Sequence, residues 1–282
     1  MNSLSARRKA SSGKAIVYIV LFYGVFAVSI PILWMLSTSL KTMVEIMSSR
    51  VNIIPGNATI QAYLSIWKNY DMFLWLKNSL IVVVFSTLCA LFFSTLAGYG
   101  SSRFRFRGKG TFLSFLLVTQ MFPAIMLLIP YYKVLQTIHL INRLSGLVVV
   151  YTSFSIPLLT WMMMGYFETI PKELDEAALI DGCSRLRTFF QIILPLTLPG
   201  LISATIYAFI HGWNEYMFAL ILISNDSLKT LPVGIAQMNG FYKIEWNELM
   251  AASIVSSIPL LLIFLFLQRY FVSSLTAGAV KQ

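Results

Sequence analysis

The sequence has few charged residues for its length. Only 11% of its 282 residues are Asp, Glu, Lys or Arg, whereas 57% are hydrophobic and the mean hydropathy is +0.76. A soluble domain averages about 25% charged residues. This shortage excludes an ordinary soluble domain and predicts an integral membrane protein.

Cysteine and histidine are also scarce, with two residues of each. Cys89 lies in an apolar run and Cys183 in a polar segment, so we expect no disulfide between them. Neither cysteine stands in metal-ligand spacing with a histidine, which argues against a zinc site. The sequence therefore predicts no bound metal.

A nucleotide-binding loop of the type G-x4-G-K-[ST] is absent. The nearest segment, Ser12-Gly13-Lys14-Ala15, lacks both the spacing and the hydroxyl residue after the lysine. No nucleophile with an adjacent base can be assembled. Residues 162–164 are methionines in an apolar run, where methionine commonly fills packing gaps. We therefore expect that the chain is not an enzyme and holds no cofactor of its own.

Long apolar runs are abundant. Each is close to the roughly 20 residues that a transmembrane helix needs, and each is too long and continuous for a β-barrel strand. The expected spans are residues 15–38, 73–99, 111–134, 144–167, 195–223 and 249–272. The first run is longer than the apolar core of a signal peptide and no clear cleavage site follows it, so we expect it to be retained. The predicted fold class is an all-α integral membrane protein with six transmembrane helices.

The distribution of Lys and Arg predicts the orientation in the membrane. With the N-terminus inside, 13 of the 21 basic residues fall in cytoplasmic segments and 8 in external ones. The dense cluster at residues 103–109 carries most of this argument, because short cytoplasmic loops retain Lys and Arg. Both termini are then cytoplasmic, and the net charge of +10 reflects membrane topology rather than nucleic-acid binding. No linker or repeat divides the chain, so residues 1–282 are expected to form a single transmembrane domain.

A polar segment at residues 169–194 interrupts the apolar runs on the predicted cytoplasmic side. Pro171 suits the first turn of a helix, Gly182 can take the left-handed conformation that ends it, and Ser184 can cap a second helix. We therefore expect a helix, a glycine turn and a second helix, with Pro195 opening the fifth span. A solvated amphipathic loop is the alternative. The acidic residues that can meet basic groups of a partner are Glu173, Asp175, Glu176 and Asp181.

Part of this segment has a spaced pattern, E-A-A-x3-G-x9-I-x-L-P. The pattern resembles the signature of the permease subunits of binding-protein-dependent ABC importers. This resemblance implies the fold of an ABC type I importer permease in a bacterial or archaeal cytoplasmic membrane. It also implies docking to an ATPase subunit, which binds ATP and Mg in place of this chain. The docking residues so implied are Glu176, Ala177, Ala178, Gly182, Ile192, Leu194 and Pro195.

Other segments are similar to the carbohydrate branch of the same family, and most similar to the second permease of maltose and multiple-sugar importers. They are Asn78-Ser79-Leu80, residues 103–108, residues 119–123, Trp213-Asn214-Glu215, residues 231–234 and residues 275–281. The resemblance implies import of an oligosaccharide or a maltodextrin-like sugar. The implied partners are a homologous second permease subunit, an ABC ATPase dimer and an extracytoplasmic solute-binding protein.

Ionisable residues inside a span are costly and are therefore candidates for function. His211 and Glu215 lie in the predicted fifth span, four residues apart and thus on one helical face. Trp213 and Asn214 between them offer an aromatic face and hydrogen-bonding groups to a sugar. These four residues form a possible substrate path. Pairing of Glu215 with a neighbouring helix is the alternative.

The predicted external loop, residues 224–248, contains Asn239, Gly240, Phe241 and Tyr242. In maltose-type importers the corresponding loop faces the solute-binding protein, so these residues are possible contacts to it. An ordinary loop with a glycine turn is the alternative. Three other functions stay open: an ABC permease for a non-sugar solute, a secondary transporter coupled through intramembrane charges, and a membrane-embedded enzyme.

Overall fold

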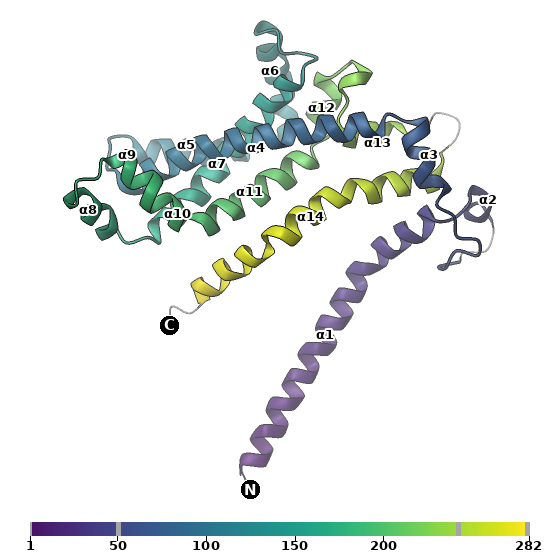
Figure 1. Ribbon diagram of the computed structural model, residues 1–282, viewed down its shortest axis with the longest axis horizontal. Coiled ribbons are helices and arrows are strands. Elements are labelled where there is room, and N and C mark those ends of the chain that lie inside the picture. The colour runs from purple at the N-terminus through teal and green to yellow at the C-terminus, as the bar shows by residue number, and fades with distance from the viewer. Residues whose placement is uncertain (1, 49–51, 241–243, 280–282) are drawn as a thin grey trace. The chain divides into compact units, whose positions relative to one another are not determined.

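The computed structural model describes residues 2–48, 52–240 and 244–279, and it is built almost entirely from helices (Figure 1). Within these residues, strand-like pairing is limited to an isolated antiparallel bridge between Asn239 and Ile244. The predicted all-α fold class is confirmed. By its internal contacts the chain divides into two compact units, Met1–Tyr70 with Met238–Val255, and Asp71–Gln237 with Ser256–Gln282. The expectation of a single transmembrane domain stays a prediction.

The first unit contains α1 (Asn2–Ser39), α2 (Met43–Ile46), α3 (Gln61–Asn69) and the first turns of α14 (Trp246–Ala279). Its buried apolar residues include Ala62, Ile66, Met238, Ala251 and Ala252. Hydrogen bonds connect the end of α1 to the loop between α2 and α3 and to α3 itself. One of them, of 2.8 Å, joins Ser39 Oγ and the Tyr63 hydroxyl. No residue in the most apolar stretch of α1 is buried, so its side chains are available to lipid or to another subunit.

The second unit is built around α4 (Met72–Arg103), α7 (Leu144–Glu168) and α11 (Leu198–Trp213). α4 and α7 pack along one another and α11 lies against both (Figure 1). The buried residues at this contact include Val82, Ala90, Leu147, Val150, Leu159, Phe167 and Ala204. These apolar side chains fix the helices relative to one another within the unit.

The close approach of α4 to α7 depends on Gly98. A Cβ atom at this position would stand 2.9 Å from both the Met163 side chain and the Met164 backbone, nearer than real Cβ atoms come. Met163 and Met164 are buried at this contact. The interpretation of these methionines as packing residues is therefore confirmed.

Four of the described helices are long and apolar enough to cross a membrane: Val17–Ser39, Met72–Arg103, Leu144–Glu168 and Trp246–Gln268. Two further pairs of helices pass the same test when each bent pair is taken as one span. By length and composition the number of spans is thus between four and six, and six stays a prediction.

One bent pair replaces the predicted third span, which we expected to be continuous over residues 111–134. α5 (Lys109–Met121) and α6 (Ala124–Thr137) meet at an angle of 104°. Phe122 is extended, with φ −76° and ψ 125°. The proline after it disfavours the helical conformation of the preceding residue and donates no hydrogen bond, so the helix ends there.

The other bent pair replaces the predicted fifth span, residues 195–223. A π-helical turn, η1 (Phe189–Ile193), continues into α10 (Leu194–Leu196), and the chain turns by 75° before α11. Pro195 and Pro199 flank this bend and cannot donate backbone hydrogen bonds. Residues 214–216 then interrupt the helix again, before α12 (Met217–Leu222). Pro195 therefore lies before a sharp bend rather than at the start of a straight span.

The predicted external loop after α12 is folded. It contains the 3-10 turn η2 (Asp226–Leu228) and α13 (Leu231–Gln237). Asn78 Nδ2 of α4 donates to the carbonyl oxygens of Ser227 and Lys229 at 3.0 and 2.9 Å, and Ser79 Oγ accepts from the Leu231 N–H at 2.7 Å. These bonds fasten the loop to the start of α4.

Candidate functional site

The polar segment forms the helix-turn-helix element that the sequence predicts, over residues 173–188. α8 (Glu173–Ile180) begins with three acidic residues, which suit the positive end of the helix dipole. Gly182 then takes a φ of +82°, and the N–H groups of Gly182 and Cys183 donate to the Leu179 and Ala178 carbonyls. This bonding pattern closes the end of a helix where a left-handed glycine follows it.

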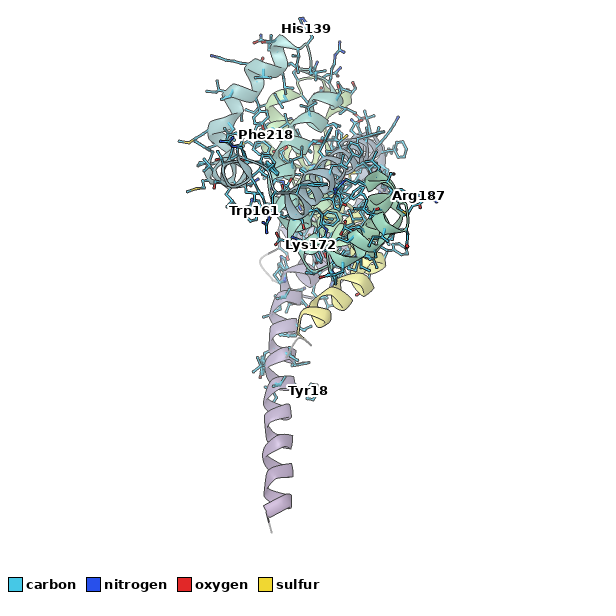
Figure 2. The ribbon with its side chains drawn as sticks, turned by 90° about the vertical axis from the view of Figure 1, so that its left-hand side faces the viewer. Tyr18, His139, Trp161, Lys172, Arg187 and Phe218 are labelled. Atoms are coloured by element: carbon cyan, nitrogen blue, oxygen red, sulfur yellow. The ribbon has the colours of Figure 1, made fainter. Side chains whose placement is uncertain are left out.

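The second helix of the element, α9 (Arg185–Thr188), is capped as predicted. Ser184 Oγ accepts a hydrogen bond of 3.3 Å from the Arg187 N–H. Lys172 and Arg187 are both exposed, and Figure 2 labels them apart from His139. The element is thus a folded projection at one end of the second unit.

Arg103, the last residue of α4, anchors α8. Its Nε lies 2.9 Å from Asp175 Oδ2, and its Nη2 donates to the Ile170 carbonyl at 3.0 Å. The Tyr99 hydroxyl donates to the other oxygen of Asp175 at 2.9 Å, while its ring packs against Phe167 and Phe189. The Arg103 side chain is only 5% exposed, so this pair is largely removed from water.

The four acidic side chains of the segment therefore divide into two groups. Asp175 is already paired within the chain. The other three are exposed and stay free to meet a partner, as the sequence suggests: Glu173, Glu176 and Asp181.

The residues of the spaced pattern also divide by location. Ala178 is buried, and Ile192 and Leu194 are half-buried against the core below the element. Those at the surface are Glu176, Ala177, Gly182 and Pro195. The pattern thus combines positions that hold the element in the fold with positions that a partner can reach. Its role in docking stays a prediction.

Two exposed apolar residues beside the turn were missed by the sequence analysis. Ile180 is 86% exposed and Leu186 is 70% exposed, although both lie in a polar element outside the predicted spans. The signal was present in the sequence, since a large aliphatic residue stands on each side of Gly182 within a hydrophilic segment. These two residues, one before and one after the turn, are called the apolar tip of the element.

A cavity of about 250 Å³ lies where the two bent pairs meet. Its lining joins two predicted path residues, His211 and Glu215, with polar groups that the sequence analysis did not select. These further polar residues are Thr119, Gln120, Ser155 and Tyr207. Phe122, at the bend, and Gln120 line the same cavity. The sequence predicts a continuous helix over residues 111–134, and these two residues were therefore not selected from it.

Glu215 has structural partners in this cavity. Its Oε2 accepts from the Tyr151 hydroxyl at 2.6 Å, and its Oε1 accepts from the Phe218 N–H at 2.8 Å. The second interaction caps the start of α12. Pairing with a neighbouring helix, the alternative raised from the sequence, is therefore present, and the same carboxylate still lines the cavity.

The other two predicted path residues, Trp213 and Asn214, do not line the cavity. Trp213 is 3% exposed, stacks on Phe209, and donates from Nε1 to the Ser256 carbonyl at 3.0 Å. Asn214 is exposed at the end of α11, where its side chain donates to the Ile210 carbonyl. The structure brings together half of the predicted path, and a role for any of the four stays a prediction.

The predicted contact to a binding protein lies in the first unit and is only partly described. Asn239 and Gly240 are exposed, and Asn239 pairs with Ile244 in the isolated bridge. Phe241 and Tyr242 lie outside the described residues. The contact stays a prediction.

Comparison with known proteins places most of this chain in one sequence family. Residues 90–277 match the family model described as "Binding-protein-dependent transport system inner membrane component". The match covers the helix-turn-helix element, the cavity between the bent pairs and most of α14.

Individual relatives are similar over nearly their full length. The chain is 35% identical over 274 residues to the sulfoquinovosyl glycerol transport system permease protein SmoH of Agrobacterium fabrum, covering 96% of this chain and 95% of that protein. It is 37% identical over 254 residues to the trehalose/maltose transport system permease protein MalG of Thermococcus litoralis, covering 89% of this chain and 91% of that protein.

A solved structure has the same fold. It belongs to a bacterial ABC transporter involved in the import of the acidic polysaccharide alginate. The TM-score is 0.81 at 24% identity, over 93% of this chain and 98% of that chain. The two bent pairs are therefore part of a chain whose overall fold a solved protein also has.

Proposed function

Because the chain belongs to the family of binding-protein-dependent transport system inner membrane components, we propose that it is a permease subunit of an ATP-driven carbohydrate importer. The family and the apolar helices make it a multi-pass protein of a bacterial or archaeal membrane. The named relatives are permeases for a sulfoquinovosyl glycerol and for trehalose or maltose, which supports a carbohydrate as the substrate.

The observation that carries the proposal is the helix-turn-helix element with its apolar tip. Ile180 and Leu186 expose aliphatic surface beside exposed carboxylates, while the buried pair of Arg103 and Asp175 fixes the element to α4. An anchored projection with an apolar tip and an acidic surround is suited to enter a cleft of another protein. We propose that the cleft belongs to an ATPase subunit, which hydrolyses ATP in place of this chain.

Closure of the ATPase dimer would then drive the permease between its inward-facing and outward-facing states. A partner shifts such an equilibrium only by the difference in its affinity for the two states. The element supplies a contact that can differ between the states, because Tyr99 and Arg103 fasten it to α4, one of the helices at the centre of the unit. The permease itself makes and breaks no bond of the substrate.

The cavity lined by Gln120, His211 and Glu215 is proposed as part of the sugar path. It offers amide, imidazole and carboxylate groups beside the rings of Phe154 and Tyr207. Sugars bind through hydrogen bonds and through contact of their C–H faces with aromatic rings. A homologous second permease would complete the path, and an extracytoplasmic solute-binding protein would deliver the sugar.

The docking proposal is tested by exchanging the tip residues. We expect Ile180→Ser and Leu186→Ser to weaken co-purification of the ATPase more than tenfold each, because a buried aliphatic side chain contributes about 1.5–3 kcal/mol. Ile138→Ser is the matched control. Ile138 is an exposed aliphatic residue, 50% exposed, that follows the last residue of α6 and lies outside the helix-turn-helix element. Equal ATPase recovery for all three variants would exclude the tip from the interface.

The substrate class is tested separately. The solute-binding protein that co-purifies with the assembled importer is screened against neutral oligosaccharides, acidic oligosaccharides, amino acids and peptides. We expect binding of a carbohydrate. Selective binding of an amino acid or peptide would leave the ABC permease assignment in place and overturn the sugar.

A further inference from the structure

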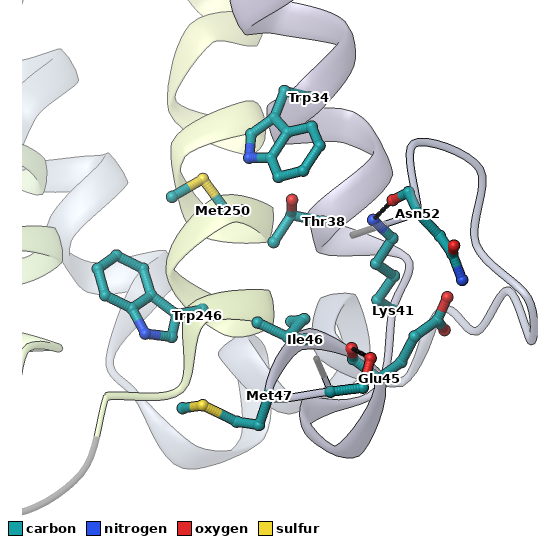
Figure 3. Close-up of a pocket in the computed structure, with 10 residues that line it drawn as sticks. Trp34, Thr38, Lys41, Glu45, Ile46, Met47, Asn52, Trp246 and Met250 are labelled. Carbon is teal, nitrogen blue, oxygen red and sulfur yellow. Dashed lines mark hydrogen bonds between the residues drawn. The ribbon is translucent and has the colours of Figure 1, made fainter. Parts of the chain in front are cut away.

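A second cavity, of about 320 Å³, lies in the first unit and has no part in the proposed transport path (Figure 3). It is formed by the end of α1, by α2 with the residues after it, and by the first turns of α14. Its aromatic walls are Trp34 and Trp246, which are 43% and 38% exposed. The apolar stretch of α1 ends at Ser39, beside residues that line the cavity, and the end of such a stretch is where a membrane-water boundary is expected.

Lys41 places a buried ammonium group at this cavity. The residue is 5% exposed; its Nζ donates to the Asn52 carbonyl and lies 5.0 Å from the centre of the Trp34 ring. Among the described residues no carboxylate oxygen lies within 4.0 Å of this nitrogen. A buried ammonium group usually has an anionic partner, so the site favours a ligand that brings one.

Thr38 adds a polar group that has no hydrogen-bond partner. Its hydroxyl oxygen is buried and makes no hydrogen bond, and the residue is 7% exposed. Figure 3 shows its side chain between Trp34 and Ile46, in the space that the cavity occupies. A buried hydroxyl without a hydrogen bond is unfavourable, and a ligand oxygen in the cavity would satisfy it.

Glu45 gives the same cavity a negative charge. Its Oε1 accepts the Gly56 N–H at 2.7 Å, and it forms no ion pair with Lys41. The lining therefore holds one positive and one negative group that form no direct ion pair with each other. A ligand with both a phosphate and an amine complements this arrangement better than a purely anionic one.

We propose that this cavity binds the headgroup of a phosphatidylethanolamine-type lipid. The phosphate would accept from Lys41 and Thr38, and the amine would face Glu45 and the tryptophan rings. The acyl chains would follow the exposed apolar surface of α1, which includes Ile30 and Leu33. Tryptophan is enriched at headgroup level in membrane proteins, as Trp34 and Trp246 would be here.

The experiment uses the assembled importer containing the full chain, in lipid discs of phosphatidylcholine with graded phosphatidylethanolamine or phosphatidylglycerol. Native mass spectrometry counts the lipids retained after gentle release. We expect preferential retention of phosphatidylethanolamine. Lys41→Met, Thr38→Val and Glu45→Gln should each weaken that retention about fivefold, as expected for one headgroup contact.

Lys68→Met is the matched control, because Lys68 is an exposed lysine of the same unit outside the cavity. If Lys41→Met fails to assemble, the nearly isosteric Thr38→Val variant decides. Three outcomes would overturn the proposal. The three lipids could be retained equally, no lipid could be retained because another subunit covers the cavity, or Lys68→Met could have the same effect as the cavity variants. Soluble glycerophosphoethanolamine, which has the headgroup without acyl chains, is added as a competitor. If it displaces the bound lipid at the same concentration as phosphatidylethanolamine does, the acyl chains do not contribute to binding and the ligand is not a lipid.

Discussion

The guanidinium group of Arg103 contacts the segment around α8 at two points, the Asp175 carboxylate and the Ile170 carbonyl. A side chain at the end of α4 thus helps to fix the position of the helix-turn-helix element, together with Tyr99. Its neighbours Arg105 and Arg107 are exposed, although the sequence presents all three as one basic cluster. Burial therefore separates a structural arginine from those that contribute charge to the surface.

Loss of this arginine should release α8. We expect Arg103→Met to destabilise the attachment of the element by about 3 kcal/mol, because it leaves the Asp175 carboxylate, whose side chain is only 15% exposed, without its cation. Hydrogen exchange of the α8 amides in the assembled importer measures this as faster exchange. Arg107→Met should leave these amides unchanged, and a similar effect of both variants would contradict a specific role for Arg103.

The two histidines of the chain provide a matched pair for the cavity. His211 lines the cavity, whereas His139 is exposed in the turn after α6 with a φ of +55°, which asparagine tolerates. We expect His211→Asn to raise the apparent KM for sugar uptake about fivefold, the equivalent of one hydrogen bond to the substrate. His139→Asn should leave KM unchanged. Unchanged uptake kinetics for His211→Asn would remove this residue from the path.

At the scale of single elements, the turn between α8 and α9 depends on the left-handed conformation of Gly182. We expect Gly182→Ala to destabilise the turn by about 1–2 kcal/mol, because a Cβ atom in that conformation meets the following carbonyl. Thermal unfolding of the purified permease and recovery of the ATPase should both decrease.

Gly165→Ala is the matched control for this substitution. Both glycines have open space around an added Cβ atom, but Gly165 lies inside α7 and lacks the positive φ. Alanine there should stabilise the helix by up to about 1 kcal/mol. Effects of the same sign for the two variants would show that the backbone conformation of Gly182 is not what the turn requires.

The helix-turn-helix element could be predicted in detail because its signals are local. Gly182 and Ser184 act on the backbone within a few residues, so spacing in the sequence is enough to place them. The bend at Phe122 also has a local signal, Pro123. The prediction of a continuous third span missed it because it relied on the unbroken apolar run of residues 111–134. Apolar composition reports the environment of a segment, whereas proline determines whether the helix within it is continuous.

The candidate cavity could be predicted only in part because its contacts are not local. His211 and Glu215 stood out as ionisable residues in an apolar run. The partner of Glu215, Tyr151, lies 64 positions away on α7, and no sequence spacing indicates that pair. Trp213 was chosen for its aromatic ring, yet packing against Phe209 and Ser256 gives it a place in the core.

At the scale of the whole molecule, the distribution of basic residues predicts which side of the membrane each loop occupies. After replacement of Cys89 and Cys183 by serine, we expect Ile180→Cys to react with a membrane-impermeant maleimide only from the cytoplasmic side. Ile138→Cys should react only from the external side. Both positions are exposed in the second unit, so access to the reagent depends on the membrane. Labelling of both cysteines from the same side would contradict the predicted topology.

α4 has a polar attachment near each of its ends. Asn78 and Ser79 hold the folded loop at one end, and Arg103 and Tyr99 hold α8 at the other. Asn78 and Arg103 are separated by roughly 38 Å of continuous helix. Because α4 is one continuous helix between these attachments, a movement of α8 is transmitted along the axis of α4. A displacement imposed on α8 would therefore also move η2 and α13.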